Sequence, residues 1–466
     1  MYGLSLKVRQ VQIYKKEKII MNDLTNKLAE CNEKIALEPN NASAYAKRGY
    51  VYLDMGNFDS ALVDCNKSIE LDPNNADYYN DRGWIYWRTG QSDNAVSDYS
   101  KAISINPKKA NYFNNRGRVY MSVGKLDEAI TDFTKGISID PNSVNCYGNR
   151  GLAYTLIQQY ESALSDFDKA IELNPHNADY YSDRGGAYSG MQKYDKALAD
   201  CNKAIGLAPN NSIYYMERGN ILSAMQKYDE AIADYTKGIE LEPGDIGYYF
   251  IRGNEYKINI KNYEAAISDY SKVIKLDSNN VEAYNDRADA YRLNKQFDEA
   301  ISDYSKAIDL NPNDAYAYYR RGYMYWINKK QWDSARPDLM KAEGSEYDEA
   351  VKATLNDIES AEKAFLEIKT KAENGDVEAQ TAMGIIYLEG HGVTIDPSMA
   401  AYWFKRAATC GDGDAQAKYL LALMYIHGQS APQDSEKEAG ELLLEAAVQG
   451  FEAAKELIED MARLSK

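Results

Sequence analysis

Apolar and small residues recur along most of this chain at an interval of 34 residues. The segment 76–107, ADYYNDRGWIYWRTGQSDNAVSDYSKAISINP, contains one complete period. Glycine keeps this step at seven positions, and Ala288 and Gly322 continue the series: Gly49, Gly83, Gly117, Gly151, Gly185, Gly219 and Gly253. Proline keeps the same step from Pro73 to Pro243. Nine matching copies predict an array of one repeated structural unit.

Each copy predicts two helices joined by a tight turn. In the copy above, Tyr79 and Gly83 share one helical stripe, and Ala95 and Tyr99 share another at the same spacing. Small residues at both stripes let two helix backbones approach closely. Gly90 suits the turn because glycine adopts positive φ without strain. Such a pair cannot bury its apolar face alone and must stack on copies of itself.

These residues resemble the tetratricopeptide repeat, from about Ala42 to Glu343. The resemblance implies an all-α fold, a right-handed superhelical α-solenoid of stacked helix–turn–helix repeats. We expect nine repeats over 42–345, preceded by a capping helix at 22–41. The basic residues 1–21 lack the apolar core of a signal peptide. They are expected to be a misassigned start or a disordered arm, with a basic docking arm as the alternative.

The C-terminal part shows a second, related pattern. Residues 346–371 predict a single helix that bridges to it. Residues 372–466 predict two further repeats and a closing helix. The first of these repeats, Gly375 to Gly411, resembles a Sel1-like repeat through the following residues: Ala379, Gly384, Tyr387, Gly390, Gly392, Val393, Asp396, Ala400, Trp403, Ala407 and Ala408. The second copy matches through Ala417, Tyr425, Gly428, Ala439, Ala446 and Gly450.

Arginine precedes the glycine position in all nine copies, and the second helix of each copy carries aspartate. Both residues fall at the edge of a buried stripe, so a ladder of ion pairs is expected. Four central pairs exemplify it: Arg82 with Asp98, Arg116 with Asp132, Arg150 with Asp166, and Arg184 with Asp200. We interpret the ladder as a device that aligns helices. The alternative is a charged surface that binds a ligand.

Candidate binding residues lie beside the buried stripe of the first helices, which line the groove in the family's architecture. They are Asn80, Trp84, Trp87 and Arg88 in one copy, and Tyr319, Tyr323 and Trp326 in the ninth. Exposed tryptophan and tyrosine are common anchors of protein interfaces. The alternative is that these rings only pack between adjacent helices.

Composition narrows the classes of function. The net charge of −17 argues against nucleic-acid phosphate as a partner. The five cysteines form no CxxC pair, which suits a reducing compartment, and no segment approaches membrane-spanning length. The three histidines have no second metal ligand at a suitable spacing, and no nucleophile or phosphate-binding motif is present. We therefore expect no cofactor, metal site or membrane association, and a cytoplasmic location.

The sequence favours a non-enzymatic scaffold or adaptor that holds a peptide or protein segment in the groove. The Sel1-like end would offer a second docking surface. Two alternatives stay open: a regulatory subunit of an enzyme complex, and a self-assembling structural array. The scaffold is expected to be a monomer until its partner binds.

Overall fold

The computed structural model describes residues 23–429 and 435–464, and the predicted leader at 1–21 lies outside them. Within these ranges the chain consists of helices and connecting turns, without a strand. It divides into two compact units, one ending at Pro243 and the other beginning at Gly244. The predicted all-α class of stacked helical repeats is therefore confirmed.

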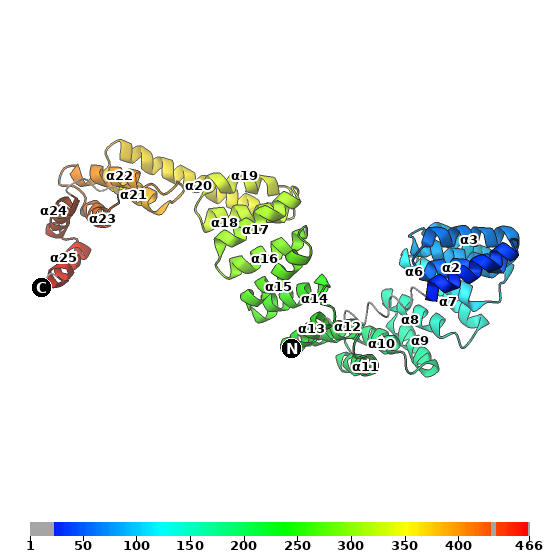
Figure 1. Ribbon diagram of the computed structural model, residues 1–466. Coiled ribbons are helices and arrows are strands. Elements are labelled where there is room, and N and C mark those ends of the chain that lie inside the picture. The colour runs from blue at the N-terminus through cyan, green and yellow to red at the C-terminus, as the bar shows by residue number, and fades with distance from the viewer. Residues whose placement is uncertain (1–22, 430–434, 465–466) are drawn as a thin grey trace. The chain divides into compact units, whose positions relative to one another are not determined.

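The first unit begins with a helix over 23–37 and continues as helix pairs (Figure 1). The pairs are α2 (Ala42–Asp54) with α3 (Phe58–Leu71), α4 (Ala76–Arg88) with α5 (Ser92–Ile105), α6 (Ala110–Ser122) with α7 (Leu126–Ile139), α8 (Val144–Leu156) with α9 (Tyr160–Leu173), α10 (Ala178–Gly190) with α11 (Tyr194–Leu207), and α12 (Ser212–Ala224) with α13 (Tyr228–Leu241). The second helices from α3 to α11 also pack against the first helix of the following pair. The core is therefore a row of similar small clusters.

The second unit contains three more such pairs and then a different helical arrangement. Its elements are α14 (Ile246–Glu255), the π-helix η1 (Tyr256–Ile260), α15 (Tyr263–Leu276), α16 (Val281–Leu293), α17 (Phe297–Leu310), α18 (Ala315–Ile327), α19 (Trp332–Ala342), α20 (Asp348–Glu373), α21 (Val377–Glu389), α22 (Pro397–Thr409), α23 (Ala415–Ile426), α24 (Ser435–Val448) and α25 (Glu452–Leu464). Over the two described ranges, every helix is too short or too polar to cross a membrane.

The start of most first helices is fixed by a polar cap. The side chain of Asn75, for example, accepts a hydrogen bond from the backbone N–H of Asp77. Equivalent caps occur at Asn41, Asn177, Asn211, Asp245, Asn280 and Asp314. Each cap satisfies a backbone donor that the first helical turn leaves free.

The turn inside each pair contains one residue in the left-handed conformation. Glycine fills this position in the first three repeats, whereas glutamine or lysine fills it in the other six. The nine residues are Gly56, Gly90, Gly124, Gln158, Gln192, Gln226, Lys261, Lys295 and Lys330, with φ between 51° and 78°. The turn geometry thus persists without glycine, although a side chain there costs about 1 kcal/mol of strain.

The seventh repeat has one residue more between Gly253 and Ala266 than the second repeat has between Gly83 and Ala95. The structure absorbs this residue at the end of the first helix, where Tyr256–Ile260 form a π-helical turn. Lys261 then takes the left-handed position. A π-turn accommodates an inserted residue without disturbing the helix before it.

Close packing between the two helices of a pair depends on the glycine of the first helix. A Cβ atom on Gly117 would lie 2.7 Å from the Phe133 ring. The contact is looser in the first repeat, where Cys65 takes the place of the ring. There a Cβ on Gly49 would lie 3.7 Å from the Cys65 Sγ, an ordinary contact. In these two repeats the size of the second-helix residue sets how much room a Cβ atom would have at the glycine position.

Substituting the two glycines should have opposite effects. We expect Gly117→Ala to lower the free energy of unfolding by about 1–3 kcal/mol, because the Phe133 ring must move. Gly49→Ala should leave stability unchanged or raise it by up to about 1 kcal/mol, because alanine favours helix. Urea unfolding followed by circular dichroism measures both. Equal losses would show that the second-helix side chain does not set the tolerance.

Candidate functional site

The arginine of every repeat grips the aspartate of its own second helix with two hydrogen bonds. In each pair Nε and Nη2 donate to the two carboxylate oxygens over 2.6–2.9 Å. The pairs are Arg48–Asp64, Arg82–Asp98, Arg116–Asp132, Arg150–Asp166, Arg184–Asp200, Arg218–Asp234, Arg252–Asp269, Arg287–Asp303 and Arg321–Asp338. The aspartate side chains are only 2–9% exposed.

A further hydrogen bond of the arginine reaches back to the preceding second helix. Nη1 of Arg150 donates to Thr134 Oγ1 over 3.0 Å. The same Nη1 contact is made by Arg48 to Asn32, Arg82 to Asn66, Arg116 to Ser100, Arg184 to Asp168, Arg218 to Asn202, Arg287 to Ser271, and Arg321 to Ser305. One guanidinium thus joins three helices, a contact that sequence reasoning missed. The geometry favours our prediction that the ladder aligns helices.

Two predicted groove residues, Asn80 and Trp84, line a pocket on the first helices of the first three repeats. Its volume is about 330 Å³, and Tyr50, Asp81 and Asn115 also line it. The Asn115 amide donates to Asn80 Oδ1 over 2.8 Å, which connects neighbouring first helices. Burial raises the pKa of Asp81, although hydrogen bonds from Tyr50 and Asn80 oppose the shift. The pocket therefore combines aromatic walls with hydrogen-bonding groups.

The other two residues predicted in that copy, Trp87 and Arg88, do not line the pocket. Trp87 packs against buried Tyr99 and its neighbours, and the guanidinium of Arg118 from the next repeat lies 4.5 Å from its ring centre. Arg88 is exposed and lies over the Trp84 ring at 5.3 Å. Packing thus accounts for Trp87, and Trp84 is the ring that faces the pocket.

The aromatic residues predicted in the ninth repeat divide in a similar way. Tyr319 stacks on Tyr347, with ring centres 5.4 Å apart and planes at 6°. Tyr323 is 36% exposed, and its ring lies 6.1 Å from that of Tyr319. Trp326 lines a separate pocket near the Sel1-like part. Each of these residues lies in the second unit, whereas Asn80 and Trp84 lie in the first.

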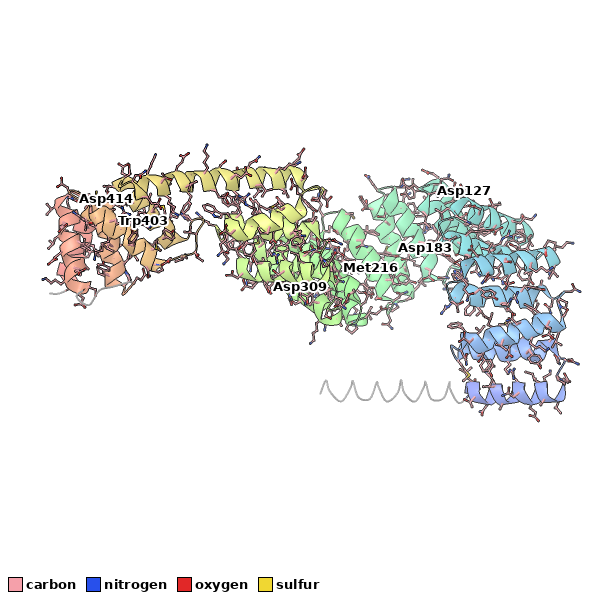
Figure 2. The ribbon with its side chains drawn as sticks, turned by 90° about the horizontal axis from the view of Figure 1, so that it is seen from above. Asp127, Asp183, Met216, Asp309, Trp403 and Asp414 are labelled. Atoms are coloured by element: carbon pink, nitrogen blue, oxygen red, sulfur yellow. The ribbon has the colours of Figure 1, made fainter. Side chains whose placement is uncertain are left out.

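A second pocket in the first unit is acidic, and sequence reasoning missed it. It has a volume of about 380 Å³ and is lined by α8, α10 and α12, including Asp179, Asp183 and Glu217. Figure 2 labels Asp183 on α10. Tyr214 donates its hydroxyl proton to Asp179 over 2.6 Å, and the Ser182 hydroxyl donates to Glu217. The three carboxyl groups thus come from two adjacent first helices.

Burial makes two of these carboxyl groups unusually weak acids. Burial, and then the negative charges of Glu217 and Asp179, raise the pKa of Asp183 to about 7. Burial also raises the pKa of Glu217, although the hydrogen bond from Ser182 opposes the shift. A cation placed in this pocket would favour the ionised forms.

A periodic signal in the sequence could have identified both pockets. The residue immediately before the ladder arginine is polar in each of the first six repeats, and the five such residues of repeats two to six line one of the two pockets. They are Asp81, Asn115, Asn149, Asp183 and Glu217, and we name them the pre-arginine stripe. The spacing of 34 residues between them is present in the sequence, but the residue type varies from copy to copy, whereas the neighbouring position is arginine in all nine copies.

The fold and these surfaces define a helical-repeat protein built from stacked helix pairs. Sequence models of the tetratricopeptide repeat match residues 42–245 and 260–328, and the Sel1 repeat model matches 377–412 and 415–451. The tetratricopeptide segments alone span more than half of the chain. The chain therefore belongs to the tetratricopeptide repeat family and has C-terminal Sel1 repeats.

Three solved structures are similar to parts of this chain. A tetratricopeptide repeat protein from Parabacteroides merdae ATCC 43184 is 23% identical, covering 53% of this chain and 97% of that one, with a TM-score of 0.45. MamA from Desulfovibrio magneticus RS-1 is 23% identical, and the match covers 37% of this chain and 97% of MamA, with a TM-score of 0.34. YrrB, described as a TPR protein with an unusual peptide-binding site, is 24% identical, covering 40% and 95%, with a TM-score of 0.32.

Breaking one ladder pair should cost more than replacing it. In Arg150→Ala the buried Asp166 carboxylate loses its partner, which we expect to cost about 3–5 kcal/mol of unfolding free energy. The double variant Arg150→Leu with Asp166→Leu leaves no buried charge and should lose clearly less. Urea unfolding measures both, and equal losses would argue against the pairing role of the ladder.

The raised pKa of Asp183 predicts that stability changes with pH. Between about pH 4 and 7 the folded state holds a proton that the unfolded state releases, so the free energy of unfolding falls as pH rises through this window. At pH 8, Asp183→Asn should be about 1–3 kcal/mol more stable than the wild type, and near pH 4 the two should be similar. The control is Asp127→Asn, which changes an exposed aspartate on α7. Urea unfolding of this variant should depend on pH as it does in the wild type. If the pH dependence of unfolding were the same in Asp183→Asn as in the wild type, the raised pKa of Asp183 would be contradicted.

Proposed function

We propose that this chain is a non-enzymatic scaffold that binds an extended segment of a partner protein along the first helices of its first unit. Tetratricopeptide and Sel1 repeats generally mediate protein–protein interactions and are typically non-catalytic. The observation that carries the proposal is the pre-arginine stripe. It supplies one polar side chain per repeat in five successive repeats, and an extended peptide presents its own polar groups at regular intervals.

The two pockets favour different side chains of that segment. The pocket at Trp84 offers an aromatic wall, and Tyr50 at its edge is 50% exposed. It suits an apolar or aromatic side chain, because such groups are the usual anchors of interfaces. The pocket at Asp183 and Glu217 holds carboxyl groups that a lysine or arginine would pair with. The partner segment is therefore expected to contain at least one basic and one bulky apolar residue.

Selection from a random peptide library on the immobilised full chain tests this proposal. Enriched peptides should contain a basic residue and a bulky apolar residue at a constant separation. A synthetic copy, followed by fluorescence anisotropy, should bind Asp183→Asn with Glu217→Gln roughly tenfold more weakly, because a charged hydrogen bond contributes about 1.5–3 kcal/mol. Trp84→Ser should weaken binding by a similar factor.

The matched control is Asp127→Asn, which removes one negative charge from an exposed site on α7, a second helix. It should bind the peptide as the wild type does, and circular dichroism should show each variant folded. If no peptide is enriched, or if the Trp84 and Asp183 variants bind unchanged, the first helices of this unit are not the binding surface.

A further inference from the structure

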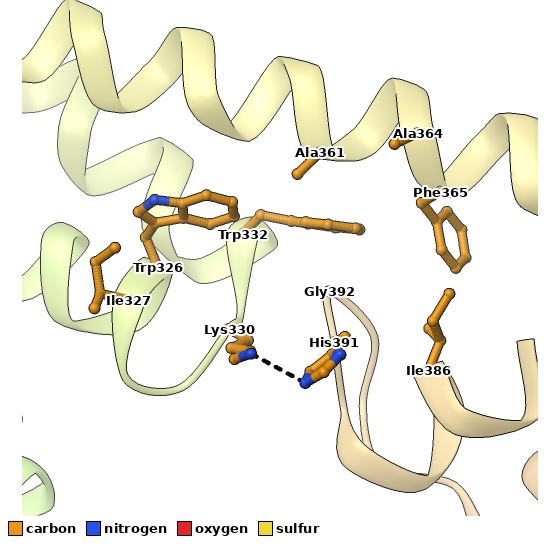
Figure 3. A pocket seen from close by; sticks show the side chains of 10 residues that line it. All are labelled: Trp326, Ile327, Lys330, Trp332, Ala361, Ala364, Phe365, Ile386, His391 and Gly392. Atoms are coloured by element: carbon orange, nitrogen blue, oxygen red, sulfur yellow. Dashed lines mark hydrogen bonds between the residues drawn. The ribbon is translucent and has the colours of Figure 1, made fainter. Parts of the chain in front are cut away.

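A largely apolar pocket of about 480 Å³ lies within the second unit, where α18 and α19 meet α20 and the loop after α21 (Figure 3). Its walls include Trp326, Trp332, Phe365 and Ile386. Ala361 also lines it and points from α20 toward the space in Figure 3. Pockets of this size with aromatic walls and few polar groups are typical of small-molecule sites.

Tight packing fixes the shape of this pocket. The backbone N–H of Gly392 donates to the carbonyl oxygen of Lys330 over 2.9 Å and so ties the loop after α21 to the turn before α19. Gly392 has a φ of +79°, and a Cβ atom there would lie 1.9 Å from the Trp332 ring. Trp332 in turn packs edge-on against Phe365, with ring centres 5.8 Å apart. The tryptophan wall is thus held from both sides.

One cationic group stands at the edge of these apolar walls. Lys330 Nζ lies 3.0 Å from His391 Nε2, and the Glu389 carboxylate lies 3.1 Å from the same nitrogen. Over residues 23–429 and 435–464, no carboxylate is within ion-pair distance of Lys330, whereas its neighbour Lys329 pairs with Asp298. The Lys330 ammonium is therefore the group at this edge that could receive the carboxylate of a ligand.

We propose that this junction pocket binds a small amphiphilic carboxylate, with a hydrocarbon body against the tryptophans and its carboxylate on Lys330. The apolar walls favour the hydrocarbon because each CH₂ group that leaves water for an apolar surface lowers the free energy. The lysine favours an anion over an alcohol of equal length because a charged hydrogen bond is stronger than a neutral one. A bound ligand would contact α18, α19, α20 and α21 together and stabilise their packing.

Titration calorimetry with sodium decanoate, below its micelle concentration, tests the site on the full chain. We expect one decanoate per chain, a change in tryptophan fluorescence and a higher melting temperature. Decanol should bind roughly tenfold more weakly, because it lacks the charge. Butyrate should also bind weakly, because it lacks most of the hydrocarbon.

Two variants and one control test whether the ligand occupies this pocket. Lys330→Gln removes the ammonium and should weaken decanoate binding roughly tenfold; glutamine already occupies the same left-handed turn position at Gln158 and Gln192. Lys295→Gln makes the same change at the equivalent turn of the preceding repeat and should bind as the wild type does. Ala364→Phe alters an exposed residue of α20 that lines the pocket and should reduce binding by filling it.

Two outcomes of these binding measurements would contradict the proposed site. Equal affinity for decanoate and decanol, or unchanged decanoate binding in both Lys330→Gln and Ala364→Phe, would overturn the proposal. Trp84→Ser lies in the other unit and should leave decanoate binding unchanged. Failure of this site is therefore distinguishable from failure of peptide binding along the first unit.

Discussion

One arginine side chain per repeat connects helices that the sequence places far apart. The guanidinium of Arg150 holds Asp166 in its own repeat and Thr134 in the preceding one. Because the guanidinium is planar and its donors have fixed directions, both contacts form only if the two second helices keep one separation and register. Each copy of the contact thus connects one repeat to its neighbour, in an array that has no single central core.

The same contact determines which surface is free for recognition. Successive residues of a helix are rotated by about 100°, so the residue before the arginine points away from the second helices that the arginine contacts. Asp183 and Glu217 stand at this position and line a pocket, while Arg184 and Arg218 face the ladder. The stripe can change its chemistry from repeat to repeat without disturbing the ladder, as Asn149 already does. The ladder and the proposed recognition surface therefore occupy adjacent positions on the same helices.

Features common to every copy could be predicted from the sequence, and features of single copies could not. The helix pairs and the arginine–aspartate pairs recur nine times, and the small residue at the helix crossing is glycine in eight of the nine copies, so periodicity shows them. The packing of Trp87 under Arg118 involves the next repeat and occurs once. The left-handed Gln158 and Lys295 lack the glycine that marks the turn elsewhere. The contact of Lys330 with His391 joins residues 61 positions apart in different repeat types, and no period relates them.

The two units offer surfaces that differ in kind for a physical reason. In the first unit identical spacing repeats one polar position, which suits a ligand that is itself extended and periodic. In the second unit the regular series ends, and the turn of the ninth repeat is widened, with the N–H groups of Asn328 and Lys329 both directed at the Met324 carbonyl oxygen. Such widened turns occur often at functional sites. Here the widened turn includes Lys330, whose carbonyl oxygen accepts a hydrogen bond from Gly392, so the end of the array forms an apolar recess rather than another copy of the stripe.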